Sequence, residues 1–390
     1  MKVVHLCHEF SALTETFIYD YLTELNRQGL EGHVVTYQVS NLDSRPFPNV
    51  HHVPRPGRWD AWRLAYRVLA KAGIGSRPDT SWDASWAAYR HRVAPLIRRL
   101  APDVLHAHFG TNGAWAWPLA QQLGVPIVVS FHGLDAFSAC DSDVYGEAYK
   151  HLFEHADGIT CVSELMWKHL VELGSDPQRT HVIHVGKRVD EYPFYPPAEE
   201  TVKAWISVGR LTEKKGHLDT LRAFRQIIDQ FPDQRLTIIG DGPLRQAVEA
   251  FVQDQGLTDH VRLLGNIAHS EVKRRLQAAD AFILSSRTAA NGDREGVPTV
   301  LMEAQFLGLP CVSTRHSGIP EVIPKENQWL LADEGEPDEV ASRMRALITA
   351  DHSTRCRLAR AGREKVESEF DLSREARKLA ELYKAVCVRD

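Results

Sequence analysis

Short, largely β-branched hydrophobic runs alternate with longer amphipathic segments along the whole chain. Within each run the hydrophobic residues are continuous rather than alternating with polar ones, which is typical of strands buried on both faces of a parallel sheet. One series of predicted strands lies in the first half, at residues 3–7, 34–39, 104–109, 127–131, 159–162 and 182–185. A second series lies at residues 205–208, 236–239, 261–264, 281–284, 311–313 and 329–331.

A proline-rich segment at residues 192–197 separates the two series and predicts an interdomain linker. The pattern therefore predicts an α/β protein with two doubly wound, Rossmann-like domains, at residues 1–195 and 196–372. The last helical stretch, residues 373–390, is expected to pack back on the first domain. Such sheets bind ligands at the carboxyl ends of their strands, so two domains facing each other would form a cleft lined by the loops that follow the strands.

The composition agrees with a two-domain α/β protein and argues against several classes of function. The 390 residues carry a net charge of −5, which argues against a protein that coats nucleic acid. The six cysteines are scattered without the spacing of a structural zinc site, so we expect a reducing compartment. No stretch approaches the ~20 apolar residues that span a bilayer, and we expect a cytoplasmic protein whose membrane contact, if any, is peripheral at the inner face of the cell membrane.

Two cations follow the first strand of the second series. Arg210 comes directly after Gly209, and Lys215 lies further along the loop, before Gly216. A guanidinium and an ammonium directed at one point can neutralise a diphosphate without a metal ion. Taken alone, the cluster fits a solvated basic turn better than a ligand site.

A helix start and two glycines suit the same ligand. Gly240 and Gly242 follow the next predicted strand and let the backbone come close to a ligand. Pro298 is placed to start a helix, so the free amides near Thr299 and Val300 would point at a phosphate.

Two carboxylates flank this helix start. Glu295 precedes it and Glu303 lies within it. Because a carboxylate accepts several hydrogen bonds, Glu303 could hold ribose hydroxyls while Glu295 holds sugar-ring hydroxyls. The alternative is an exposed loop residue and an ordinary helix face, which would not need the flanking Gly296 and Pro298.

These motifs together resemble the retaining glycosyltransferases of family 4, which have the two-domain GT-B architecture. The likeness rests on four motifs and extends over nearly the whole chain; the motifs are residues 209–216, 240–243, the pair Glu295 and Glu303, and 317–321. It implies Arg210 and Lys215 at the donor diphosphate, Glu295 at the transferred sugar and Glu303 at the ribose. Bacterial members that build exopolysaccharides are the most similar.

Two positions depart from the family pattern. Members commonly carry two glycines before Ile-Pro-Glu, whereas this chain has Ser317 and Gly318. The approach to the linker, residues 185–190, contains two additional residues.

Histidines mark the first domain. A lone histidine at a strand end, such as His132, is usually packed or hydrogen-bonded, but the resemblance implies that His132 lies beside the reacting sugar. His106 and His108 share a strand face, yet no third ligand is apparent, and we expect no metal. Asp141 and Asp143 mimic a metal motif of another glycosyltransferase architecture, where chance is the simpler explanation.

The loop after the first strand offers polar groups to the donor phosphate or to the acceptor. These are Thr14, Glu15 and Thr16, whose hydroxyls and amides precede a predicted helix.

Residues 55–100 combine helically spaced aromatic residues with many arginines. Such faces suit the headgroup region of an anionic membrane. Two helices that pack their aromatic residues on the first domain would explain the pattern as well.

The sequence thus predicts a metal-independent, retaining transferase that moves a hexose-type sugar from a nucleotide diphosphate sugar to a glycan or lipid-linked acceptor. It needs no cofactor, and a UDP-sugar donor is expected ahead of a GDP-sugar. A sugar-nucleotide 2-epimerase or a non-catalytic sugar-nucleotide sensor on the same architecture are the alternatives.

Overall fold

The chain folds into two compact α/β units. The computed structural model describes residues 1–12, 15–57, 59–61, 64–65, 84–137, 143–198 and 201–388. Unit 1 comprises Met1–Gly186 with Leu372–Asp390, and unit 2 comprises Lys187–Asp371. The division therefore falls after Gly186, earlier than the 195/196 boundary expected from the prolines, because residues 187–195 pack with the second sheet's unit.

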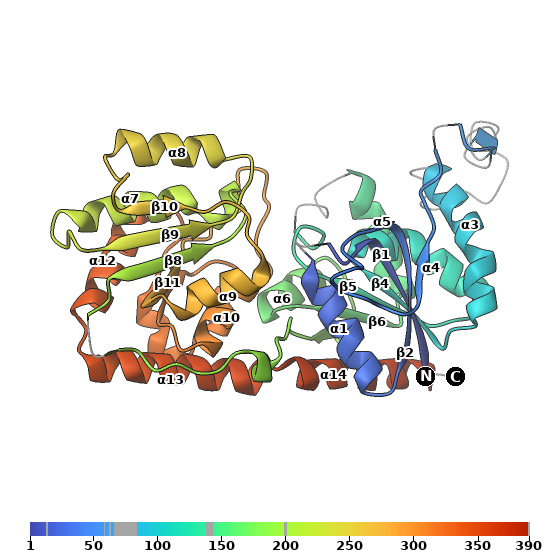
Figure 1. Ribbon diagram of the computed structural model, residues 1–390. Helices are drawn as coiled ribbons and strands as arrows, with labels where there is room; N and C mark the ends of the chain where they lie inside the picture. Colours follow the sequence, from blue (N-terminus) through green and yellow to red (C-terminus); the bar gives the residue numbers. More distant parts are fainter. Residues whose placement is uncertain are drawn as a thin grey trace. The chain divides into compact units, whose positions relative to one another are not determined.

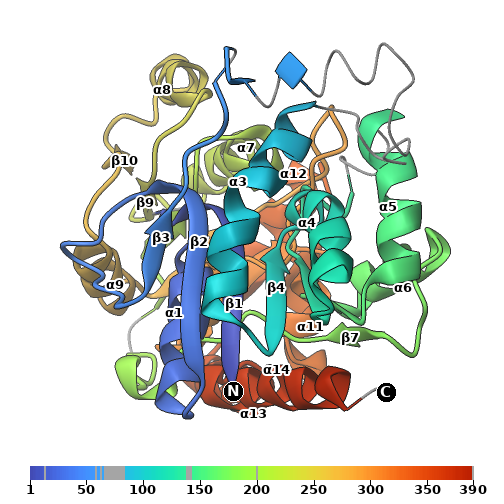
Figure 2. The same ribbon diagram turned by 90° about the vertical axis from the view of Figure 1, so that its right-hand side faces the viewer.

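Unit 1 is built on a seven-stranded sheet in which all described pairings are parallel, with the order β3-β2-β1-β4-β5-β6-β7 (Figures 1 and 2). The strands are β1 (Lys2–Phe10), β2 (Glu31–Val39), β3 (Val50–His52), β4 (Val104–His108), β5 (Ile127–Phe131), β6 (Gly158–Cys161) and β7 (Thr180–Val182). The order reverses between β1 and β4, and this switch point is where doubly wound sheets bind ligands.

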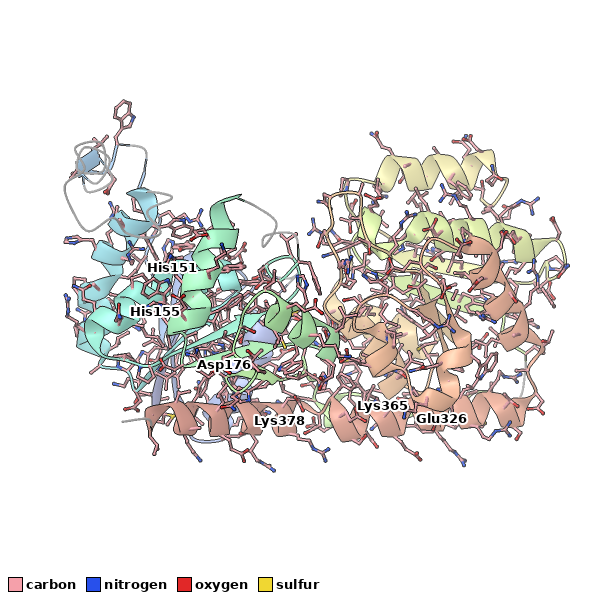
Figure 3. All side chains as sticks on the ribbon, turned by 180° about the vertical axis from the view of Figure 1, so that it is seen from behind. His151, His155, Asp176, Glu326, Lys365 and Lys378 are labelled. Carbon is pink, nitrogen blue, oxygen red and sulfur yellow. The ribbon has the colours of Figure 1, made fainter. Side chains whose placement is uncertain are left out.

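Helices cover the sheet of unit 1. They are α1 (Thr16–Arg27), α3 (Ala84–Leu100), α4 (Gly110–Leu123), α5 (Asp143–His155), α6 (Glu164–Glu172) and α14 (Leu372–Cys387). Helix α14 buries Leu372, Leu379, Tyr383 and Val386, which recur at helical spacing against the sheet and α1. Lys378 lies on its exposed face (Figure 3). The C-terminal helix is thus an integral layer of unit 1.

Unit 2 repeats the architecture with a six-stranded parallel sheet in the order β10-β9-β8-β11-β12-β13 (Figure 1). Its strands are β8 (Ala204–Val208), β9 (Arg235–Ile239), β10 (Val261–Leu263), β11 (Ala281–Leu284), β12 (Cys311–Thr314) and β13 (Leu331–Ala332). Its helices are α7 (His217–Ile228), α8 (Arg245–Asp254), α9 (His269–Gln277), α10 (Thr299–Phe306), α11 (Ile319–Val322), α12 (Pro337–Thr349) and α13 (His352–Glu369), with 3₁₀ turns η1 (Val189–Glu191), η2 (Glu213–Lys215) and η3 (Lys325–Leu330).

The two segments that connect the units lie side by side at the edge of unit 2. The N–H of Lys187 donates to the carbonyl of Phe370 at 2.9 Å, and Lys187 forms a parallel bridge with Asp371. The chain therefore leaves and re-enters unit 1 through one hydrogen-bonded pair of segments.

Candidate functional site

The loop after β8 carries both predicted phosphate cations. Lys215 ends the 3₁₀ turn η2, and Gly216 follows with a φ of +63°. A Cβ on Gly216 would lie 1.7 Å from the carbonyl oxygen of Ser285, so only glycine allows α7 to begin here. Arg210 is exposed, and its guanidinium has no hydrogen-bond or ion-pair partner among the residues that the structure describes.

The two glycines predicted to lie at the donor, Gly240 and Gly242, allow the loop after β9 to pack closely against the loop after β8. Gly240 has a φ of +136°, and a Cβ there would lie 2.0 Å from the carbonyl oxygen of Gly209. A Cβ on Gly242 would lie 2.7 Å from the carbonyl oxygen of Leu211. Packing between the loops after β8 and β9 therefore accounts for these glycines without a ligand. Their place at the donor stays a prediction.

Glu295 and Lys215 form the centre of the site in unit 2. The Lys215 ammonium lies 2.7 Å from Glu295 Oε2, and Lys214 Nζ lies 3.7 Å from Glu295 Oε1. Lys214 also pairs with Asp293 at 3.1 Å. Burial raises the pKa of Glu295, but the two ammonium groups outweigh it and hold the pKa below its usual value. Glu295 is thus a carboxylate that orients a lysine.

The backbone behind Glu295 is fixed by the loop after β12. The N–H of Glu295 donates to His316 Nε2 at 3.1 Å, and the Ser317 hydroxyl donates to the Glu295 carbonyl at 2.5 Å. Ser317 has a φ of +46°, a left-handed conformation that glycine adopts without strain. Ser317, which stands where the resemblance led us to expect a glycine, is therefore a strained serine whose hydroxyl supports Glu295.

Helix α10 begins where the sequence predicts. Pro298 is its N-cap residue and Thr299 its first residue, so the amides of Thr299 and Val300 have no acceptor within the helix. Glu303 is buried one turn further on, and its Oε1 atom lies 3.4 Å from Lys187 Nζ. The sequence did not indicate the Lys187 contact, because Lys187 and Glu303 are far apart along the chain.

In unit 1, His132 follows β5 in a rigid turn. The Asp135 carboxylate accepts hydrogen bonds from the N–H groups of Gly110, His132 and Gly133, at 2.8, 3.0 and 2.9 Å. The His132 ring contacts Phe17, with the ring centroids 4.6 Å apart. Neither ring nitrogen has a hydrogen-bond partner among the described residues, and burial holds the pKa of His132 well below its usual value. The imidazole is therefore neutral and available to a ligand.

Strain and an unpaired carboxyl group accompany His132. Phe109, whose ring contacts His132 edge-on, has a φ of +71°, which is rare for an aromatic residue and typical of functional sites. Glu15 stands at the N-cap position of α1, and its buried Oε2 has no hydrogen-bond partner among the described residues. Burial, Glu9 and Asp135 together raise the pKa of Glu15 to about 7. Thr16 begins α1, whereas Thr14 lies outside the described residues.

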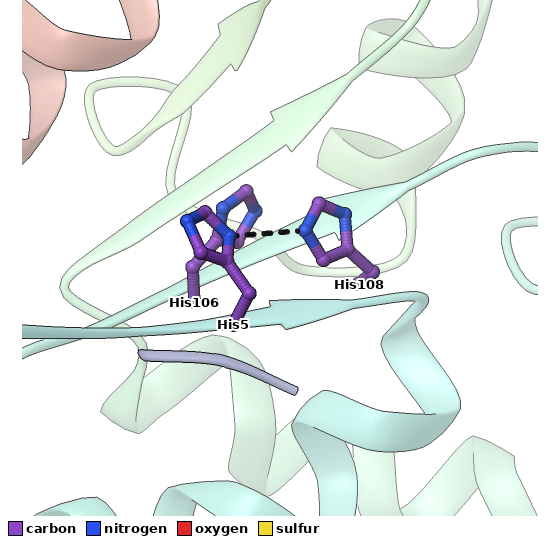
Figure 4. Close-up of side chains that lie close together, drawn as sticks. All are labelled: His5, His106 and His108. Carbon is purple, nitrogen blue, oxygen red and sulfur yellow. Dashed lines mark hydrogen bonds between the residues drawn. The ribbon is translucent and has the colours of Figure 1, made fainter. Parts of the chain in front are cut away.

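The structure brings a third histidine, His5, next to His106 and His108, which the sequence alone did not indicate. His5 of β1 pairs in register with His106 of β4, and the three rings of His5, His106 and His108 gather on one face of the sheet (Figure 4). His5 Nδ1 lies 3.2 Å from His108 Nε2, while the two nitrogens of His106 contact the hydroxyls of Tyr383 and Ser130 at 2.5 and 2.7 Å. These bonds form a buried network between α14 and the sheet, and an ion bound there would have to displace part of it. Asp141 lies outside the described residues, as does the side chain of Asp143.

The aromatic stripe divides into a packed part and an exposed part. Trp86 and Tyr89 of α3 are buried against Trp115, and the guanidinium carbon of Arg55 lies 4.6 Å from the centroid of Trp86. Trp59 is 81% exposed. Residues 58, 62–63 and 66–83 lie outside the described residues. The part of the stripe on α3 therefore packs in the core, and membrane contact by the rest stays a prediction. Within the described ranges, no helix combines the length and hydrophobicity that a membrane span requires.

Two family models match nearly the whole chain. The model described as "Glycosyl transferases group 1" matches residues 189–365, and that described as "Glycosyl transferase 4-like domain" matches residues 14–186. The boundary between the matches agrees with the division between the two units.

Relatives that match over their full length are also glycosyltransferases. A protein of Escherichia coli K12 named as a colanic acid biosynthesis glycosyltransferase, WcaL, is 37% identical and covers 99% of this chain and 100% of its own length. The amylovoran biosynthesis glycosyltransferase AmsK of Erwinia amylovora is 35% identical, with 98% and 99% covered. Among solved structures, Anabaena HepE in complex with UDP and glucose superimposes with a TM-score of 0.78 over 99% of this chain and 100% of its own, at 17% identity. The fold is that of the GT-B glycosyltransferases.

Proposed function

Because the chain belongs to the glycosyl transferases of group 1, we propose that it is a retaining, metal-independent hexosyltransferase that uses a nucleotide diphosphate sugar. Its relatives named for colanic acid and amylovoran biosynthesis support a role in assembling a bacterial exopolysaccharide. The acceptor is then a hydroxyl of a glycan or of a lipid-linked glycan at the inner face of the cell membrane.

The observation that carries the proposal is the ion pair between Lys215 and Glu295. Lys215 lies on the loop after β8, which also carries the guanidinium of Arg210. Fixed cations can hold a diphosphate in place of a divalent ion. The free amides at the start of α10 add partial positive charge. Glu295, held ionised by its lysines, is suited to accept hydrogen bonds from sugar hydroxyls.

In the proposed reaction, the bond between the anomeric carbon and the diphosphate oxygen breaks while the acceptor oxygen bonds to the same face of the sugar. The acceptor proton passes to an oxygen of the departing diphosphate, so no protein nucleophile is required. Arg210 and Lys215 stabilise the charge that develops on the leaving group, and this electrostatic term supplies most of the rate enhancement. His132 lies beside the reacting sugar, where its neutral ring donates to or accepts from a hydroxyl.

A panel of UDP- and GDP-sugars, tested with a glycan acceptor, examines the proposal directly. UDP-sugars come first, because the HepE structure of the same fold contains UDP and glucose. We expect product whose anomeric proton has the NMR coupling of the donor configuration, and activity that persists in excess EDTA. An inverted product would contradict retention, and loss of activity restored by manganese would contradict metal independence. An epimerised nucleotide sugar formed without acceptor would instead identify a 2-epimerase.

A further inference from the structure

An ammonium group is buried against the carboxylate assigned to the ribose. The side chains of Lys187 and Glu303 are 7% and 5% exposed, and Lys187 Nζ lies 3.4 Å from Glu303 Oε1. Among the described residues, Glu303 has no other hydrogen-bond or ion-pair partner. Lys187 is therefore the one cation that compensates this buried charge within the described part of unit 2.

The backbone of Lys187 is held in place independently of its side chain. Its N–H donates to the carbonyl of Phe370, and its neighbour in the parallel bridge is Asp371. The end of α10 is linked to the segment that follows Lys187, because the Arg363 guanidinium donates to the carbonyls of both Phe306 and Tyr192. The rings of Phe306 and Tyr192 stack at 5.7 Å between centroids. Both partners of the ion pair thus stand on anchored backbone.

Lys187 lies just ahead of the linker, in the segment 185–190 that departs from the family pattern in the sequence analysis. A lysine in an exposed connecting segment would lie in solvent, where its backbone and its ammonium group are free to move. This lysine is instead nearly fully buried and faces a carboxylate in α10. Such burial of a charge is tolerated only with a partner, because removing either one leaves an uncompensated charge.

We propose that Lys187 is a positioning residue for nucleotide binding, which holds the Glu303 side chain in the orientation that accepts the two ribose hydroxyls of a nucleoside diphosphate. The inference rests on the proposed function, in which Glu303 contacts the ribose. A carboxylate can accept from the ammonium with one oxygen and from a diol with its remaining lone pairs. Lys187 then acts on the nucleotide only through Glu303.

The test measures the dissociation constant of UDP by calorimetry for the wild type and for Lys187→Met, Lys187→Arg, Glu303→Gln and the Lys187→Met/Glu303→Gln double variant. Lys187→Met should weaken UDP binding about tenfold or more, as expected when a charge-assisted contact is lost, and Lys187→Arg should restore most of the affinity. In the Glu303→Gln background, Lys187→Met should add less than about twofold, because the interaction that it removes is already gone. The exposed Lys325→Met serves as the matched control and should bind UDP like the wild type.

A purely structural lysine gives a different result. Lys187→Met would then lower the melting temperature but leave the UDP affinity of the folded protein unchanged, or weaken it equally in both backgrounds, and either result would overturn the inference. Should Lys187→Met not fold, Lys187→Gln, which keeps a polar head, replaces it with the same expected affinities. If Glu303→Gln itself leaves UDP binding unchanged, the ribose assignment fails and the inference with it. Failure of Lys187 alone leaves the proposed function standing.

Discussion

The two glutamates of the site in unit 2 have different surroundings and therefore different expected roles. Glu295 pairs with Lys215 at the loop after β8, whereas Glu303 lies within α10 beside Lys187. Glu295→Gln should lower turnover of the sugar donor while sparing binding of UDP, and Glu303→Gln should weaken both the donor and UDP. Calorimetry with UDP and initial rates with donor separate the two effects. Equal loss of UDP affinity in both variants would contradict the assignment.

Ser317 offers a test of how the site stores strain. Ser317→Ala keeps the left-handed backbone but removes the hydroxyl that donates to the Glu295 carbonyl, and we expect a loss of about 1 kcal/mol in the free energy of unfolding with reduced turnover. Ser317→Gly removes the hydrogen bond and the backbone strain together, so its stability should stay closer to the wild type. Chemical denaturation measures both. A glycine variant less stable than the alanine variant would show that Ser317 is not strained.

At the level of single residues, position at the end of a strand could be predicted from the sequence, and the partners of the side chains could not. Arg210, Lys215, Glu295 and His132 could be selected because each follows a predicted strand or precedes a helix. The Lys187 contact could not be predicted, because a lysine before the linker carries no signal that it will meet α10. The contribution of His5 was hidden for the same reason, since strand register decides which face it shares with His106.

Among the elements, strands β1 and β4 and the turn after β5 bury titratable groups whose effect on stability depends on pH. Burial lowers the pKa of His108 to about 3, and the pKa values of His5, His106 and His132 also lie well below 6.5. In the unfolded chain these groups bind protons near pH 6.5, so the unfolded state binds more protons than the folded state at any pH between the two values. The contribution of these histidines to the free energy of unfolding is therefore fully present above pH 6.5, and it falls as the pH is lowered below 6.5.

For His108 this loss extends from pH 6.5 down to about 3, with a slope of about 1.4 kcal/mol per pH unit. Unfolding free energies measured at pH 7.5 and 5.0 should show the decline, and His108→Gln should make it shallower by that slope. An equally steep decline in His108→Gln would mean that this imidazole is charged in the folded protein.

Element prediction succeeded where hydrophobic runs were long and failed at edges. The central strands of both sheets lie where continuous β-branched runs predict them, but β3 (Val50–His52) was missed because two of its three residues are histidines. The predicted strand at residues 329–331 begins instead as the 3₁₀ turn η3, and only Leu331–Ala332 pair with β12. The prolines placed the domain boundary too far along the chain, because the turn η1, which precedes them, already belongs to unit 2.

For the whole molecule, the exposed end of the aromatic stripe predicts reversible membrane binding. Trp59 is 81% exposed, and several arginines surround it in sequence. Each basic residue near an anionic surface contributes about 1 kcal/mol, and the contribution weakens as the screening length falls from roughly 10 Å at 0.1 M salt to roughly 3 Å at 1 M. Wild-type protein should sediment with anionic liposomes at low salt and be released at high salt.

Two variants locate this contact. Trp59→Ala and the triple replacement of Arg58, Arg63 and Arg67 by glutamate should each reduce sedimentation while leaving transfer to a short soluble acceptor intact. Trp329→Ala, which removes a tryptophan from unit 2, should sediment like the wild type. If the wild type ignores anionic liposomes at low salt, the stripe is packed structure only and the acceptor need not be membrane-bound.

The release of nucleoside diphosphate during turnover tests whether Arg210 and Lys215 carry the reaction. With a saturating UDP-sugar and acceptor, Arg210→Ala and Lys215→Ala should each lower the rate of UDP release about a hundredfold or more, as expected when one preorganised charge-stabilising group is lost. Lys325→Met, an exposed lysine of the same unit, should release UDP at the wild-type rate. Near-wild-type release in both Arg210→Ala and Lys215→Ala would contradict transfer at this site.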